Sequence, residues 1–145
     1  MTAQPDQKVT PLTRMDQVRL LDQRAVVEKL FEGEDWRQKY QNTAGKLGTI
    51  RAILSNGIFK SDQTYELQCL GVVLGDAFVQ ELSMEWVMAE DRFGRDPAVR
   101  LPGTNIILFP LTMISKRVER GETVDVFDLF NGVAARVEEF RQHGF

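Results

Sequence analysis

Alternation of hydrophobic and polar residues predicts a β-rich segment at the centre of the chain. Met84, Trp86 and Met88 occupy every second position, which is typical of a half-buried strand. The charged tip at residues 91–94 ends in a glycine, the residue that most readily takes the positive φ of a hairpin. Three antiparallel strands joined as a meander are therefore expected, at residues 84–90, 98–101 and 105–109.

A helix is predicted directly after these strands. Pro110 suits its first turn, where the missing N–H costs no hydrogen bond, and Leu111, Ile114 and Val118 follow at helical spacing. Gly121 stands where such a helix commonly ends. A final helix carries an apolar seam at Val126, Phe130, Val133, Val137 and Phe140. This seam is expected to pack on the domain itself, with a homodimer built on it as the alternative.

Helical periodicity also dominates the N-terminal half. Residues 1–10 are polar and are expected to form a flexible tail. A helix is expected over residues 11–31, a helix break near 42–45, and a further helix over about 62–82. The first of these helices has its predicted core-facing residues at Met15, Val18, Leu21, Ala25 and Leu30.

Gly71 and Gly75 lie one turn apart in the helix expected at residues 62–82. Small residues on one helix face allow another backbone to come close, so this patch is expected to pack inside the domain, against a helix or the sheet. Polar and charged neighbours, including Asp76, exclude a helix pairing in lipid. Trp86 is expected to be a core anchor under the helices, with an aromatic residue of a binding surface as the alternative.

These elements predict one α+β domain over residues 11–145, with N-terminal helices, a helix packed on a small three-stranded antiparallel sheet, and two C-terminal helices. With 145 residues, 43% of them hydrophobic, the chain is long enough to bury a sizeable core. Its net charge of −3 gives no general attraction to nucleic acid or anionic membranes. No apolar run approaches the ~20 residues of a membrane helix. The first residues lack the apolar core of a secretory signal, so a cytoplasmic protein is expected.

Three segments, which cover roughly residues 62–121, resemble a known bacterial family. They are the runs LGVVLGDAFVQEL, EWVMAEDRFGRDPAV and LFPLTMISKRVERGE. They are similar to domain of unknown function 3806, whose pattern would be carried here by Gly71, Gly75, Trp86, Gly94, Pro110, Lys116, Arg117 and Gly121. The resemblance supports the expected fold. It implies no reaction, because the family has no established activity.

The sequence contains few residues suited to catalysis. Cys69, the single cysteine, is expected in an apolar helix, and the single histidine, His143, is close to the C-terminal end. Metal-binding and phosphate-binding motifs are absent. Glu90, Asp91 and Asp96 are expected to be solvated acids around the hairpin turn. We therefore expect no catalytic residue, no metal and no cofactor.

Two groups of residues are candidates for binding. Trp36 and Tyr40, one helical turn apart, are candidates for an interface because aromatic residues often contribute much of the binding energy. A basic group could meet an anionic surface on a partner, and its members are Arg92, Arg95, Arg100, Lys116, Arg117 and Arg120. The alternative is structural, because cations near a helix C-terminus stabilise the helix and pair with neighbouring acids.

The leading functional hypothesis is a non-catalytic cytoplasmic protein-binding domain. An immunity-type inhibitor that neutralises a bacterial toxin is one form of it, suggested by analogy with other small, mildly acidic single domains. The alternative is a small-anion sensor or minor enzyme in which Arg100, Lys116 and Arg117 hold the anion. Neither nucleic acid nor a membrane is expected as a partner, since the net charge is negative and aromatic residues do not interleave with the basic ones.

Overall fold

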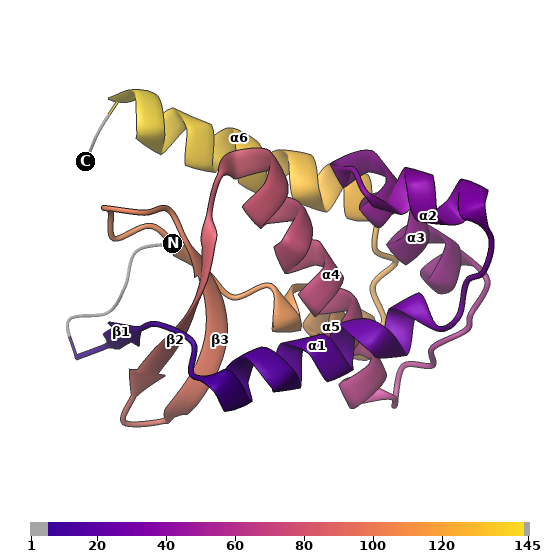
Figure 1. The fold of residues 1–145 in the computed structure, drawn as a ribbon, viewed down its shortest axis with the longest axis horizontal. Helices are drawn as coiled ribbons and strands as arrows, with labels where there is room; N and C mark the ends of the chain where they lie inside the picture. Colours follow the sequence, from indigo (N-terminus) through magenta and orange to yellow (C-terminus); the bar gives the residue numbers. More distant parts are fainter. Residues whose placement is uncertain (1–5, 144–145) are drawn as a thin grey trace.

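The computed structural model describes residues 6–143, and Figure 1 shows how its elements are arranged. Helix α4 runs through the middle, with α1 and α6 on opposite sides, the sheet at one end and α2 and α3 at the other. In chain order the elements are β1 (Lys8–Thr10), α1 (Arg14–Glu28), α2 (Glu34–Tyr40), α3 (Thr43–Ser55), α4 (Thr64–Leu82), β2 (Glu85–Asp91), β3 (Gly94–Arg100), β4 (Ile107–Leu108), α5 (Leu111–Glu119) and α6 (Val126–His143). None of the helices in residues 6–143 is long and apolar enough to cross a membrane.

The sheet is antiparallel with the strand order β1-β2-β3-β4, which confirms the α+β class and the predicted meander of β2, β3 and β4. It has one more strand than expected, because β1 pairs with β2 and places Val9 opposite Ala89. The predicted tail is therefore wrong for residues 8–10, and residues 1–5 lie outside the described part. A strand of three residues is too short to show alternation in the sequence. The third predicted strand is also shorter than expected, at Ile107–Leu108.

Helix α4 forms the centre of the main hydrophobic core. Eleven of its side chains or glycines are buried, from Leu67 to Leu82. Its two glycines explain how neighbouring elements come so close. A Cβ atom on Gly71 would lie 2.6 Å from the carbonyl oxygen of Pro110, and one on Gly75 would collide with the Trp86 ring. The predicted internal packing of this patch is confirmed, and its neighbours are α5 and the sheet.

The boundaries of the remaining helices follow the predicted patterns closely. The break between α2 and α3 is confirmed at Asn42, whose side chain accepts a hydrogen bond from the Gly45 N–H at 2.8 Å and caps α3. Gly121 ends α5 with a φ of 81°, as the glycine signal indicates. The α6 seam is packed inside the domain, since Val126, Phe130 and Val137 are buried. Val133 and Phe140 are half-buried and pack against the same core, so the seam packs on the domain itself as expected.

Helix α1 turns the opposite face to the core from the one predicted. Met15, Val18 and Leu21 are 82%, 48% and 59% exposed, whereas Leu20 and Val27 are buried. The remaining buried residues of α1 are Asp16 and Gln23. Two of the four buried positions are therefore polar, which makes the buried face look hydrophilic in the sequence. The outer face, with Met15, Val18 and Leu21, is the more apolar one, so the sequence pattern predicted that it would face the core.

Asp16 joins the start of α1 to the β2–β3 hairpin. Its carboxylate accepts two hydrogen bonds of 2.7 Å from the Arg95 guanidinium and one of 2.8 Å from the Thr13 N–H. The Thr13 hydroxyl in turn accepts from the Asp16 N–H, which completes a capping box. Hydrogen bonding to Arg95 holds the pKa of Asp16 well below its usual range, although burial acts in the opposite direction.

This ion pair predicts an acid-sensitive contribution to stability. Asp16 has a lowered pKa in the folded state, so its contribution is complete above the unfolded pKa of about 3.9 and declines as the pH falls below it. We expect the free energy of unfolding of the native protein to exceed that of Asp16→Asn at pH 7, and the difference to narrow at pH 3. Urea unfolding at pH 7 and pH 3 measures this difference in stability. An equal difference at the two pH values would contradict the role of Asp16 in the ion pair.

Candidate functional site

The six predicted basic residues do not form one patch. Arg92 and Arg95 lie at the hairpin tip, where the Arg92 guanidinium stands 4.9 Å from the Phe93 ring centre. Arg100 lies at the other end of β3 and pairs with Glu85 at 2.8 Å. Most of these cations therefore have partners within the domain.

The three basic residues of the α5 region differ in their surroundings. Arg117 donates a hydrogen bond of 2.7 Å to the Met113 carbonyl oxygen, and Arg120 pairs with Glu122 at 2.9 Å. Lys116 forms no ion pair with any residue in the described part of the chain, and it lines a cleft against the hairpin. Arg100 and Arg117, the other two residues of the anion site suggested from the sequence, do not line this cleft.

The two predicted interface aromatics lie within an aromatic stack. The Trp36 ring lies between Phe31 and Tyr40, at centroid distances of 5.5 and 4.7 Å, and its N–H donates to the Thr49 hydroxyl at 3.1 Å. Burial, reinforced by the nearby Glu28 carboxylate, raises the pKa of Tyr40. Trp36 also lines a hollow of about 400 Å³ at α2 and α3. Both residues thus attach α2 to the rest of the domain.

Cys69 lacks the surroundings of a reactive thiol. It is fully buried in α4, and burial raises the pKa of its thiol to about 11. A thiol with this pKa remains protonated near neutral pH and is a poor nucleophile. Within residues 6–143 no group of three or more histidine, cysteine, aspartate or glutamate side chains is arranged to hold a metal.

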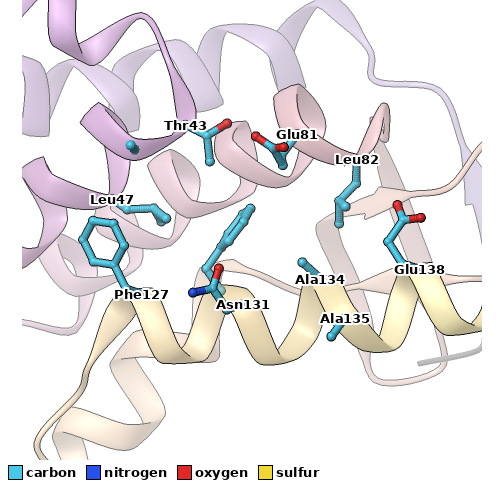
Figure 2. A pocket seen from close by; sticks show the side chains of 11 residues that line it. Thr43, Leu47, Glu81, Leu82, Phe127, Asn131, Ala134, Ala135 and Glu138 are labelled. Atoms are coloured by element: carbon cyan, nitrogen blue, oxygen red, sulfur yellow. The ribbon is translucent and has the colours of Figure 1, made fainter.

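A hollow of about 600 Å³ forms a shallow groove between α6 and the ends of α3 and α4. Figure 2 shows Leu47 of α3 and Leu82 at the end of α4 on one wall, and Phe127 and the small side chain of Ala134 on the opposite wall formed by α6. Glu81 and Glu138 stand at its edge. Glu138 also pairs with Arg141 at 2.8 Å, so this edge is partly neutralised. The groove is open and mostly apolar.

A further hollow of about 390 Å³, here called the hairpin cleft, has four charged residues in its lining. It lies where α1, α4 and α5 meet the β2–β3 hairpin. Two cations line it, Arg19 from α1 and Lys116 from α5, together with two acids from the hairpin, Asp91 and Asp96. The other lining residues are Gln7, Gln68, Ala89, Gly94, Pro97, Phe109, Leu111 and Thr112.

The third surface is the outer face of α1, defined here by Met15, Val18 and Leu21. These positions recur at every third residue, so they follow one side of the helix. Exposed apolar side chains are ordinary when scattered singly, but a continuous group commonly marks a contact surface. Their spacing was visible in the sequence, but their exposure was not.

Taken together, residues 6–143 form an α+β domain in which helices pack on a four-stranded antiparallel sheet. The chain belongs to the family described as Domain of unknown function (DUF3806), which matches residues 46–130, more than half of the chain. The predicted family is thereby confirmed, and the match extends further toward the N-terminus and into α6 than the resembling segments did.

A protein of known structure has the same fold. A crystal structure of a protein from Bacteroides thetaiotaomicron VPI-5482 matches with a TM-score of 0.69 at 14% sequence identity, over 90% of the present chain and 48% of the other. The present chain therefore spans about half the length of that protein. At this identity the match shows the fold alone. No curated protein sequence matches the chain.

Proposed function

We propose that this domain is a non-catalytic protein-binding module and that it contacts its partner through the outer face of α1. The observation that carries the proposal is the exposure of Met15, Val18 and Leu21 on one side of one helix. Full burial of a side chain of this size contributes about 1.5–3 kcal/mol, so covering the face by a partner would supply substantial binding energy. Helix faces of this kind bind apolar grooves or helices.

The charges beside this face support a particular partner chemistry. Arg14 precedes it and Lys29 follows it, both exposed, while Asp22 lies between them. A partner surface with an apolar centre and carboxylates at its edges would therefore complement it. Such edge charges act mainly on the rate of association and on specificity.

The narrower form of the proposal is an immunity-type inhibitor that acts in the cytoplasm and occupies a bacterial toxin. It is supported by the small, mildly acidic composition and by a thiol that is buried rather than reactive. It predicts that the partner is a single protein bound in equal stoichiometry. A toxin-like reading frame next to the gene would favour it.

Leu21→Glu and Met15→Glu are expected to weaken partner binding at least about tenfold, equivalent to about 1.4 kcal/mol. Each places a charge in the apolar contact, while the fold should change by no more than about 0.5 kcal/mol because both positions are exposed. Phe93→Ser is the matched control, since Phe93 is 84% exposed but lies at the hairpin tip. Co-purification from the native host, followed by titration of the recovered partner, measures the effect.

Three outcomes would count against the proposal. A partner retained by both α1 variants, or lost equally in Phe93→Ser, would place the contact elsewhere. If the native protein sediments as a dimer and the Leu21→Glu variant as a monomer, a second copy of the chain would be the occupant of this face. Thermal unfolding of every variant verifies that a loss of binding is not a loss of fold.

A further inference from the structure

The hairpin cleft is lined by charges of both signs that form no ion pair with one another. No nitrogen of Arg19 or Lys116 lies within 4.0 Å of a carboxylate oxygen among the described residues, and the same holds for Asp91 and Asp96 toward any cation. None of the four is therefore held in an ion pair inside the domain, and Arg19, Asp96 and Lys116 are exposed to solvent. Asp91 only accepts a hydrogen bond of 2.8 Å from the Phe93 N–H.

The neighbouring charges behave differently. Arg95, adjacent to Asp96 in β3, is engaged with Asp16, and Arg100 pairs with Glu85. The four charged residues that line the cleft, by contrast, form no ion pair with any described residue. The two cations come from α1 and α5, and the two acids come from the β2–β3 hairpin.

We propose that the hairpin cleft binds a free α-amino acid. Its carboxylate would lie between Arg19 and Lys116, and its ammonium group between Asp91 and Asp96. Each contact would be a charge-assisted hydrogen bond, the stronger kind in proteins. An ammonium group would also offset the repulsion between the two acids, as a carboxylate would between the two cations. A simple anion would be repelled by the acids and a simple cation by the basic pair, so a zwitterion matches best.

The size and lining of the cleft fit this class of ligand. A volume of about 390 Å³ is near the lower end of the roughly 300–1,000 Å³ typical of ligand pockets, which favours a single metabolite over a peptide. Pro97, Phe109 and Leu111 supply an apolar wall for the ligand side chain. Gln68 and Thr112 supply hydrogen-bonding groups for its polar atoms.

Isothermal titration of the full chain with each of the twenty L-α-amino acids tests the proposal. At least one is expected to bind, and its N-acetyl derivative and its amide, which lack the ammonium and the carboxylate respectively, should each bind at least about tenfold more weakly. Lys116→Ala and Asp96→Asn should each weaken binding at least about tenfold. Arg120→Ala is the matched control, because Arg120 lies one turn beyond Lys116 and is paired with Glu122 outside the cleft.

Several results would overturn the proposal. The first is that none of the twenty amino acids binds at millimolar concentration. The second is that the N-acetyl derivative or inorganic phosphate binds as tightly as the amino acid. The third is that Lys116→Ala and Asp96→Asn bind the amino acid as tightly as the native protein does. Thermal unfolding verifies that each variant is folded. Leu21→Glu on the outer face of α1 should leave amino-acid binding unchanged, so failure of this proposal and failure of the protein-binding proposal are distinguishable.

Discussion

Replacing Gly71 with alanine is expected to destabilise the domain by about 3 kcal/mol, or roughly 10 °C in melting temperature for a chain of this size. The added methyl group would lie 2.6 Å from the Pro110 carbonyl oxygen and 2.7 Å from that of Leu111. These neighbours are backbone atoms at the start of α5, so the collision is relieved only by moving that helix. Gly75→Ala should cost about 1–3 kcal/mol, because the groups it meets are the Trp86 and Pro110 side chains.

Gly132→Ala is the control, because it is expected to stabilise the domain rather than destabilise it. Gly132 lies in α6 with nothing within 4 Å of an added Cβ atom. Alanine reduces the conformational freedom of the unfolded chain, so this variant should gain roughly 0.4–1 kcal/mol. Urea unfolding of the three variants measures the differences. If Gly71→Ala were as stable as the native protein, the close approach of α4 and α5 described here would be incorrect.

Asp76→Ala is expected to have the second large effect. Asp76 accepts hydrogen bonds of 2.6 and 2.8 Å from the Arg24 guanidinium and of 3.0 Å from the Trp86 indole N–H. Its side chain is 14% exposed and that of Arg24 is 24% exposed. Removing one partner of a fully buried pair costs about 3–5 kcal/mol because the other charge is left unpaired. Partial exposure of Arg24 lowers the expected loss to about 2–3 kcal/mol.

A short series of variants separates the causes of this loss. Asp76→Asn keeps an acceptor for the Trp86 N–H, so it should be less destabilising than Asp76→Ala. The double variant Arg24→Met, Asp76→Ala removes the unpaired guanidinium and should recover part of the stability. Glu34→Ala is the control, since its pair with Arg37 is exposed on both sides and should contribute less than about 1 kcal/mol. A loss no larger for Asp76→Ala than for Glu34→Ala would show that the buried pair is not stabilising.

The elements that could be predicted from the sequence have strong local patterns. The β2–β3 hairpin, the break at Asn42 and the end of α5 at Gly121 each depend on residues within a few positions of one another. Strand β1 could not be predicted in this way. It is three residues long and is defined by its pairing with β2, far along the chain.

The candidate surfaces were less predictable than the fold. Lys116 was among the predicted residues, but Arg19 was not, because it joins the hairpin cleft only after α1 packs beside α4 and α5. Trp36 and Tyr40 were predicted for their chemistry, yet their position in an aromatic stack depends on how α2 folds back on α3. No local pattern in the sequence reports such relationships.

The amino-acid sequence by itself determined the family, the α+β class and the small-residue face of α4, because periodicity and glycine positions express local geometry. Only the tertiary structure decided which side of α1 meets the core and which charges are paired. Asp16 and Arg95 are 79 residues apart, and Arg24 and Asp76 are 52 apart. Burial of polar residues through such distant pairs reverses the apparent polarity of a helix, and it leaves Met15, Val18 and Leu21 facing outward.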